Sequence, residues 1–131
     1  MRAVMIPCSF GEAADKITIL RIKSERMTDP GQLANVRKEL NLLATQFFAA
    51  VAAGAAIDAL MAALKSVNET LWDVEDGLRA HEARGDFGPD FVALARSVYA
   101  TNDERARLKR EINRLLGSEL SEEKLYGSEP S

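Results

Sequence analysis

The chain has 131 residues, 47% of them hydrophobic and 28% charged, which fits one globular domain with a single core. Its formal net charge of −3 excludes the overall basic field of a typical nucleic-acid-binding protein, so we expect no nucleic-acid partner and only a local anion site. The single cysteine, Cys8, excludes an intramolecular disulfide. With one histidine, His81, the chain also lacks the ligands for a structural zinc site.

Two apolar segments bear on the cellular compartment. The run after Arg2 ends at Pro7 and is too short for the apolar region of a signal peptide. The run over residues 47–56 is rich in small residues and about half the length of a membrane span. We therefore expect a cytoplasmic protein with no membrane partner.

The first half of the chain predicts a short arm and two helices. Residues 2–7 alternate weakly and end at a proline, which is typical of an extended arm. Ser9 and Glu12 form a capping box, which predicts a first helix to about Met27. A second helix is expected from about Gln32 to Ala53, since its apolar residues recur three and four apart until Gly54.

The second half predicts two longer helices. Unbroken 4-3 spacing of apolar residues indicates a third helix from about Ile57 to Ala83. Pro89 opens a fourth helix, which runs to about Leu116 with Gly117 as its cap. We expect residues 1–126 to form one helical domain and residues 127–131 to be a frayed tail.

Short breaks between long helices predict an all-α fold of about four helices, either an antiparallel bundle or a pair of long helical hairpins. The first helix carries two apolar stripes, one with Ile17, Leu20 and Met27 and the other with Ile19 and Ile22. It is therefore expected to be sandwiched, either centrally or against another subunit. Because 4-3 spacing also suits coiled-coil packing, we expect a homodimer.

A polar row interrupts the apolar seam of the fourth helix. Each helical residue turns about 100°, so Asn102, Arg105 and Lys109 share a narrow stripe with Ile112 and face inward. A buried cation without a partner costs several kcal/mol. The row must therefore meet carboxylates, a ligand or water.

The third helix offers a second row beside its apolar stripe, formed by Asn68, Trp72, Glu75, Arg79 and Glu82. If the third and fourth helices form a hairpin that turns near Phe87, antiparallel register places Trp72 level with Asn102 and Asn68 near Arg105. The first helix adds Asp15 and Arg26, which share a side and could point into the same site. Glu12 and Lys16, four residues apart, are expected to pair on the surface.

Two interpretations of these rows stay open. In the first, they form a pocket for a small anionic ligand such as a phosphosugar or nucleotide sugar: Arg105 and Lys109 contact the anion, Trp72 stacks on a ring, and Glu75 accepts a hydroxyl proton or holds Arg105. The predicted ligand-binding residues are Asp15, Arg26, Asn68, Trp72, Glu75, Arg79, Asn102, Arg105 and Lys109. In the second, the rows are a register layer in an oligomerisation or adaptor module, without a ligand.

A third interpretation is a magnesium-dependent all-α phosphohydrolase. Asp73 and Asp76 have the three-residue spacing by which a helix presents two ligands to Mg²⁺, as in all-α nucleotide pyrophosphohydrolases. The pattern departs from those enzymes because Asp73 lies opposite the apolar stripe, on the solvent side. We therefore expect no metal site and no cofactor. The sequence has no Gly-rich phosphate loop, Ser/His/Asp order or Cys/His cluster, so no catalytic residue is assigned.

Motifs along nearly the whole chain together carry a family resemblance; they include Gly11-Glu12, Asp15–Leu20, Leu33–Leu40, Val67-Asn68, Leu71–Asp73, Gly85–Phe87, Thr101–Asp103, Lys109–Asn113, Leu116–Ser118 and Glu122–Lys124. With them the chain resembles a bacterial family of short helical proteins that is a domain of unknown function. The resemblance implies a context near or with glycosyltransferase and surface-polysaccharide genes. The resemblance thus implies a sugar-nucleotide or phosphosugar ligand, or an accessory role in glycan assembly, and it implies no catalytic residues.

Overall fold

The computed structural model describes residues 2–118, which form four α-helices and, within that range, no β-strand. The helices are α1 (Phe10–Arg26), α2 (Pro30–Ala50), α3 (Ala55–Arg84) and α4 (Pro89–Leu116). The predicted all-α class with four helices is confirmed. The tail predicted at residues 127–131 lies outside the described residues.

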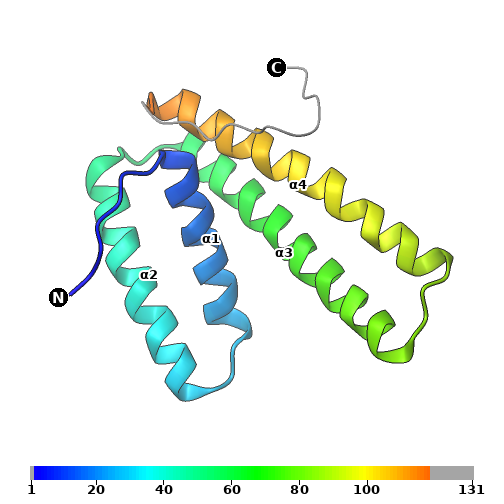
Figure 1. The fold of residues 1–131 in the computed structure, drawn as a ribbon. Coiled ribbons are helices and arrows are strands. Elements are labelled where there is room, and N and C mark those ends of the chain that lie inside the picture. Colours follow the sequence, from blue (N-terminus) through cyan, green and yellow to red (C-terminus); the bar gives the residue numbers. More distant parts are fainter. Residues whose placement is uncertain (1, 119–131) are drawn as a thin grey trace.

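The helices form two hairpins, α1 with α2 and α3 with α4, which meet at one end and diverge at the other (Figure 1). Helix α1 packs against all three other helices, whereas α2, among the described helices, packs against α1 alone. The two apolar stripes of α1 are therefore used within one chain, and of the two placements expected for this helix the central one is confirmed. The space between the diverging hairpins flanks the C-terminal end of α1.

The helix ends follow the capping signals of the sequence. The Ser9 hydroxyl accepts a hydrogen bond from the Glu12 amide at 3.1 Å, so this half of the predicted capping box is confirmed. Asp29 caps α2 in the same way, with Pro30 in the first turn. Gly85 and Gly117 end α3 and α4 with φ values of +65° and +67°, where a side chain would strain the backbone.

Helix α2 ends earlier than predicted. The sequence favoured a helix to Ala53, because apolar residues recur three and four apart until Gly54. The structure ends α2 at Ala50, and Val51 adopts an extended conformation with its side chain buried. Burial of Val51 in the core therefore outweighs the helix propensity of the alanines that follow it.

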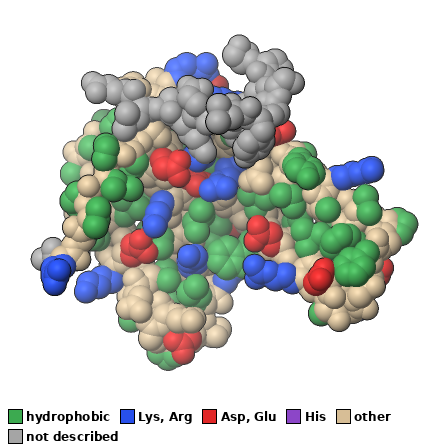
Figure 2. Space-filling view, in the orientation of Figure 1, with side chains coloured by type: hydrophobic (Ala, Val, Ile, Leu, Met, Phe, Trp, Pro, Cys, Tyr) green, Lys and Arg blue, Asp and Glu red, His purple; other side chains and the backbone are tan. Residues whose placement is uncertain are grey.

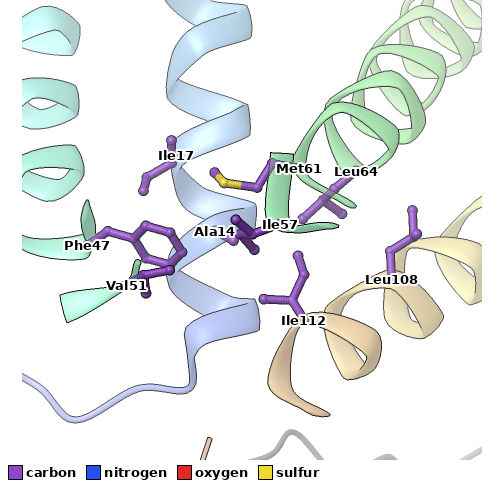
Figure 3. Close-up of a cluster of buried hydrophobic side chains, with 9 residues drawn as sticks. All are labelled: Ala14, Ile17, Phe47, Val51, Ile57, Met61, Leu64, Leu108 and Ile112. Carbon is purple, nitrogen blue, oxygen red and sulfur yellow. The ribbon is translucent and has the colours of Figure 1, made fainter. Parts of the chain in front are cut away.

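The core lies where the four helices come together (Figure 3). It is built by nine buried side chains from all four helices and the α2–α3 connection, namely Ala14, Ile17, Phe47, Val51, Ile57, Met61, Leu64, Leu108 and Ile112. Fully burying one such aliphatic or aromatic side chain contributes about 1.5–3 kcal/mol. This cluster fixes α1 against the α3/α4 hairpin, and so positions the polar groups beside it.

Residues 2–8 precede α1 and are exposed. Val4, Met5 and Ile6 leave 72% to 87% of their surface open to solvent, and this segment belongs to no helix or strand. The predicted arm therefore adds no packing to the described fold.

Candidate functional site

A buried carboxylate joins three helices beside the core. Asp15 of α1 is 2% exposed, and its Oδ1 accepts hydrogen bonds from Nε of Arg105 on α4 and from Nδ2 of Asn68 on α3, both at 2.9 Å. Nη2 of Arg105 donates to the other carboxylate oxygen, so the guanidinium binds Asp15 with two parallel bonds. The predicted proximity of Asn68 to Arg105 thus arises through a shared partner.

Thr18 completes this cluster. Its Oγ1 accepts a second hydrogen bond from Nδ2 of Asn68 at 2.9 Å and donates to the Asp15 carbonyl at 2.7 Å. Within the described part of the chain, no buried side-chain nitrogen or oxygen lacks a hydrogen-bond partner. We call Asp15, Thr18, Asn68 and Arg105 the Asp15 lock, because hydrogen bonds among these four side chains join α1, α3 and α4.

The second cation of the predicted row is also paired. Nζ of Lys109 lies 2.9 Å from a carboxylate oxygen of Glu12, and 9% of the Lys109 side chain is exposed. Lys16, which the sequence paired with Glu12, instead lies 3.2 Å from Glu39 on α2, so that prediction was wrong. Glu12 pairs with Lys109 of α4 because the start of α1 crosses α4 at close range. Asn102, the third member of the row, is half-buried.

The close crossing of α1 and α4 depends on Gly11. A Cβ built on Gly11 would overlap the Lys109 carbonyl oxygen and would lie 3.0 Å from Oδ1 of Asn113. The same Oδ1 accepts a hydrogen bond from the Gly11 amide at 2.7 Å, which satisfies a free donor at the start of α1. Neither Gly11 nor Asn113 was singled out from the sequence, since a glycine inside a helix gives no sign of which chain approaches it.

A different group of predicted residues surrounds a hollow on α3, beyond the end of α1. Its described lining is Trp72, Glu75, Asp76 and Arg79, and its volume is about 260 Å³. Trp72 is half-buried and the three charged residues are exposed, so the hollow opens to solvent. Figure 2 shows acidic, basic and apolar side chains side by side over the space between the hairpins. We call these four residues the Trp72 hollow.

The lining of the Trp72 hollow contrasts with the Asp15 lock. The side chains of Glu75, Asp76 and Arg79 form no hydrogen bond or ion pair with any described residue. Among the described residues, the Trp72 ring has a cation–π contact with Arg26. Aromatic surface, two carboxylates and one guanidinium are therefore available together at this place.

Arg26 ties the last turn of α1 to the edge of the hollow. Its guanidinium carbon lies 5.8 Å from the centroid of the Trp72 ring, and its Nη1 donates to Asp73 at 2.7 Å. The hydrogen bond that Arg26 donates to Asp73 raises the pKa of Arg26, and the charges of Asp73, Glu69 and Asp76 raise it further against the effect of burial. A cation is thus already stabilised against this indole.

The structure therefore divides the predicted site into two places. Asp15, Asn68 and Arg105 belong to the lock, with Lys109 beside it, and Trp72, Glu75 and Arg79 belong to the hollow. Glu75 is not the partner of Arg105, because Asp15 from α1 reaches the guanidinium first. Arg26 does not share a site with Asp15, since it lies three turns further along α1 and turns toward Asp73.

Asp76 is the residue of the hollow that was not predicted for ligand binding. From the sequence, Asp76 was considered only as half of a magnesium pair with Asp73. Asp73 now pairs with Arg26, and residues 2–118 contain no group of three or more His, Cys, Asp or Glu side chains placed to hold a metal ion. Asp76 follows Trp72 by four residues, so the two share a helix face, and this spacing could have placed Asp76 in the hollow.

The comparison with known protein families covers nearly the whole chain. A match to the family of unknown function (DUF6165) spans residues 4–131. The chain belongs to this family. The resemblance to a family of unknown function is thereby confirmed, while the bacterial origin and the glycosyltransferase context that it implied stay predictions. Searches among curated proteins and among solved structures give no match.

The length and hydropathy of the helices also bear on the membrane. None of the helices in residues 2–118 combines the length and the apolar character that crossing a bilayer requires.

Proposed function

We propose that this member of the family is a small-ligand binding module, and that the ligand occupies the Trp72 hollow. The observation that carries the proposal is the difference in pairing between the two polar sites. The Asp15 lock is closed by its own hydrogen bonds, whereas Glu75, Asp76 and Arg79 face a hollow without partners among the described residues. Convergent polar groups around a partly apolar cavity are the usual form of a ligand site.

The lining defines which ligand chemistry fits. An indole packs well against the face of a ring, carboxylates accept hydrogen bonds from hydroxyl groups, and a guanidinium donates to hydroxyl or anionic oxygens. A hydroxylated ring, as in a sugar or a phosphosugar, uses all three. Sites for drug-sized ligands occupy roughly 300–1,000 Å³. The hollow, at about 260 Å³, suits one sugar ring better than a complete nucleotide sugar.

In this proposal the cation that donates to an oxygen of the ligand is Arg79, in place of Arg105 and Lys109. Asp15 and Glu12 already neutralise the two inner cations, so an anion reaching them would have to compete with carboxylates of the same chain. We propose instead that the Asp15 lock has the register role, and stabilises the packing of α1 against the α3/α4 hairpin.

Fluorescence of Trp72 tests this proposal directly, because it is the single tryptophan of the chain. We expect a saturable change in emission with at least one member of a panel of monosaccharides and sugar phosphates. The change should weaken in Glu75→Gln and persist in Glu82→Gln, which removes one exposed carboxylate from the same helix outside the hollow. No saturable response, or equal responses in both variants, would contradict the proposal.

A second candidate function, self-association, rests on a different observation. Residues 75–105, the outer part of the α3/α4 hairpin, include no buried residue. Phe87, Val92 and Tyr99 are 53%, 40% and 74% exposed there. Two paired helices gain much of their stability by burying apolar faces, and a second copy could cover these faces in a four-helix arrangement. Sedimentation velocity at micromolar concentration tests it: a dimer supports the expected homodimer, and a monomer argues against it.

We also propose a cytoplasmic location in a bacterial cell. Cys8 is the single cysteine, it is exposed, and its thiol is free, which suits a reducing compartment. Fractionation of cells expressing the full chain would test this location.

A further inference from the structure

The charges that surround Trp72 are unequal. Within the hollow, two carboxylates, Glu75 and Asp76, oppose one guanidinium, Arg79. Around its edge, Asp73 is paired with Arg26 and Glu69 lies within 4 Å of Lys65, so these residues add no free positive charge. The available charge beside the indole is therefore negative.

The indole itself receives a cation in this structure. The Arg26 guanidinium lies over the Trp72 ring, and its pKa is raised first by the hydrogen bond to Asp73 and then by the neighbouring carboxylates. An aromatic face bordered by carboxylates is the general arrangement by which proteins recognise ammonium and guanidinium groups. Arg26 does not line the hollow, so the carboxylates Glu75 and Asp76 remain open to a cation from outside.

We infer that the ligand of the Trp72 hollow is a hydroxylated ring that carries an amine, and that Glu75 and Asp76 receive its ammonium group. The inference rests on the proposed function and specifies the class of ligand. The ammonium donates to the two carboxylates, the ring packs on Trp72, and Arg79 donates to a ring or hydroxyl oxygen. A phosphate in the same place would lie against two carboxylates with one guanidinium to balance them, which is unfavourable for an anion.

Three hexoses that differ mainly in charge make a matched test: glucosamine, glucose and glucose 6-phosphate. Each is titrated into the full chain at about pH 6, where the amine is protonated, with Trp72 emission as the signal. We expect glucosamine to bind at least about fivefold more tightly than glucose, with glucose 6-phosphate the weakest, since one or two charge contacts at an exposed site are worth about this factor.

Variants locate the preference. Glu75→Gln and Asp76→Asn should each reduce the ratio of glucosamine to glucose affinity, whereas Glu82→Gln, outside the hollow, should leave it unchanged. Equal binding of glucosamine and glucose, or tighter binding of glucose 6-phosphate, would overturn the amine inference while the hollow stays a ligand site. No response to any of the three would overturn the amine inference for hexoses and count against the proposed function as well.

Discussion

Arg105 of α4 holds Asp15 of α1 through both carboxylate oxygens, across ninety positions of sequence. The Asp15 side chain is 3% exposed and that of Arg105 is 30% exposed. Arg105→Leu would leave the carboxylate buried with Asn68 as its one remaining side-chain donor among residues 2–118. We expect the free energy of unfolding to fall by about 2–4 kcal/mol, the lower part of the range reflecting the partial exposure of the guanidinium. Urea denaturation measures this loss.

The double variant Asp15→Leu with Arg105→Leu is the control for that prediction. Replacing both partners of a buried ion pair by apolar side chains removes the desolvation penalty together with the attraction. The double variant should therefore be more stable than Arg105→Leu alone. If the two variants unfold at the same urea concentration, the loss does not come from an uncompensated carboxylate.

Gly11, the one glycine of α1, is predicted to tolerate no side chain. In Gly11→Ala the new methyl group would collide with the Lys109 backbone and press on Asn113, so the helices must separate. Such overpacking costs about 1–3 kcal/mol. Gly54→Ala, where nothing lies within 4 Å of the added Cβ, should lose only the preference for glycine over alanine at the N-cap of α3, which is less than about 1 kcal/mol. Equal thermal midpoints for the two variants would contradict the close crossing.

How much of this fold could be predicted depended on the range of the contacts. The helices, their caps and the antiparallel α3/α4 hairpin follow from local spacing. A Cβ on Gly77 would lie 3.1 Å from Leu94, which fits an antiparallel hairpin, although the predicted register set Gly77 level with Ser97. Trp72, Glu75 and Arg79 were correctly grouped because they lie on one helix face.

The partner of Arg105 could not be predicted in the same way. Spacing on α3 and α4 places Glu75 near the polar row, but the position of α1 against the hairpin depends on core packing by Ile17, Leu64 and Ile112. The sequence predicted that Asp15 belongs to the site, but it did not predict the ion pair between Asp15 and Arg105. Packing between residues far apart in the sequence therefore determines which carboxylate lies within hydrogen-bond distance of Arg105.

The exposed pair of Glu104 and Arg107 gives a prediction on pH. The hydrogen bond from Arg107 lowers the pKa of Glu104 below its ordinary value. The small stabilising effect of this pair is therefore present above the ordinary glutamate range near about pH 4.3 and is lost as the pH falls through the lowered pKa. Carboxyl chemical shifts in NMR should show Glu104 titrating at higher pH in Arg107→Gln. An unchanged titration would contradict the pairing.

The central claim is that the Asp15 lock and the Trp72 hollow have separate roles, stability and binding. The direct measurement compares, by fluorescence titration with glucosamine and by urea denaturation, the Asp15→Leu/Arg105→Leu double variant with Glu75→Gln. The double variant is expected to keep its affinity for glucosamine within about twofold. Glu75→Gln should lose affinity and unfold at the wild-type urea concentration, because its side chain is exposed. Loss of binding in the folded double variant, with binding intact in Glu75→Gln, would contradict the claim and return the ligand to the polar row of α4.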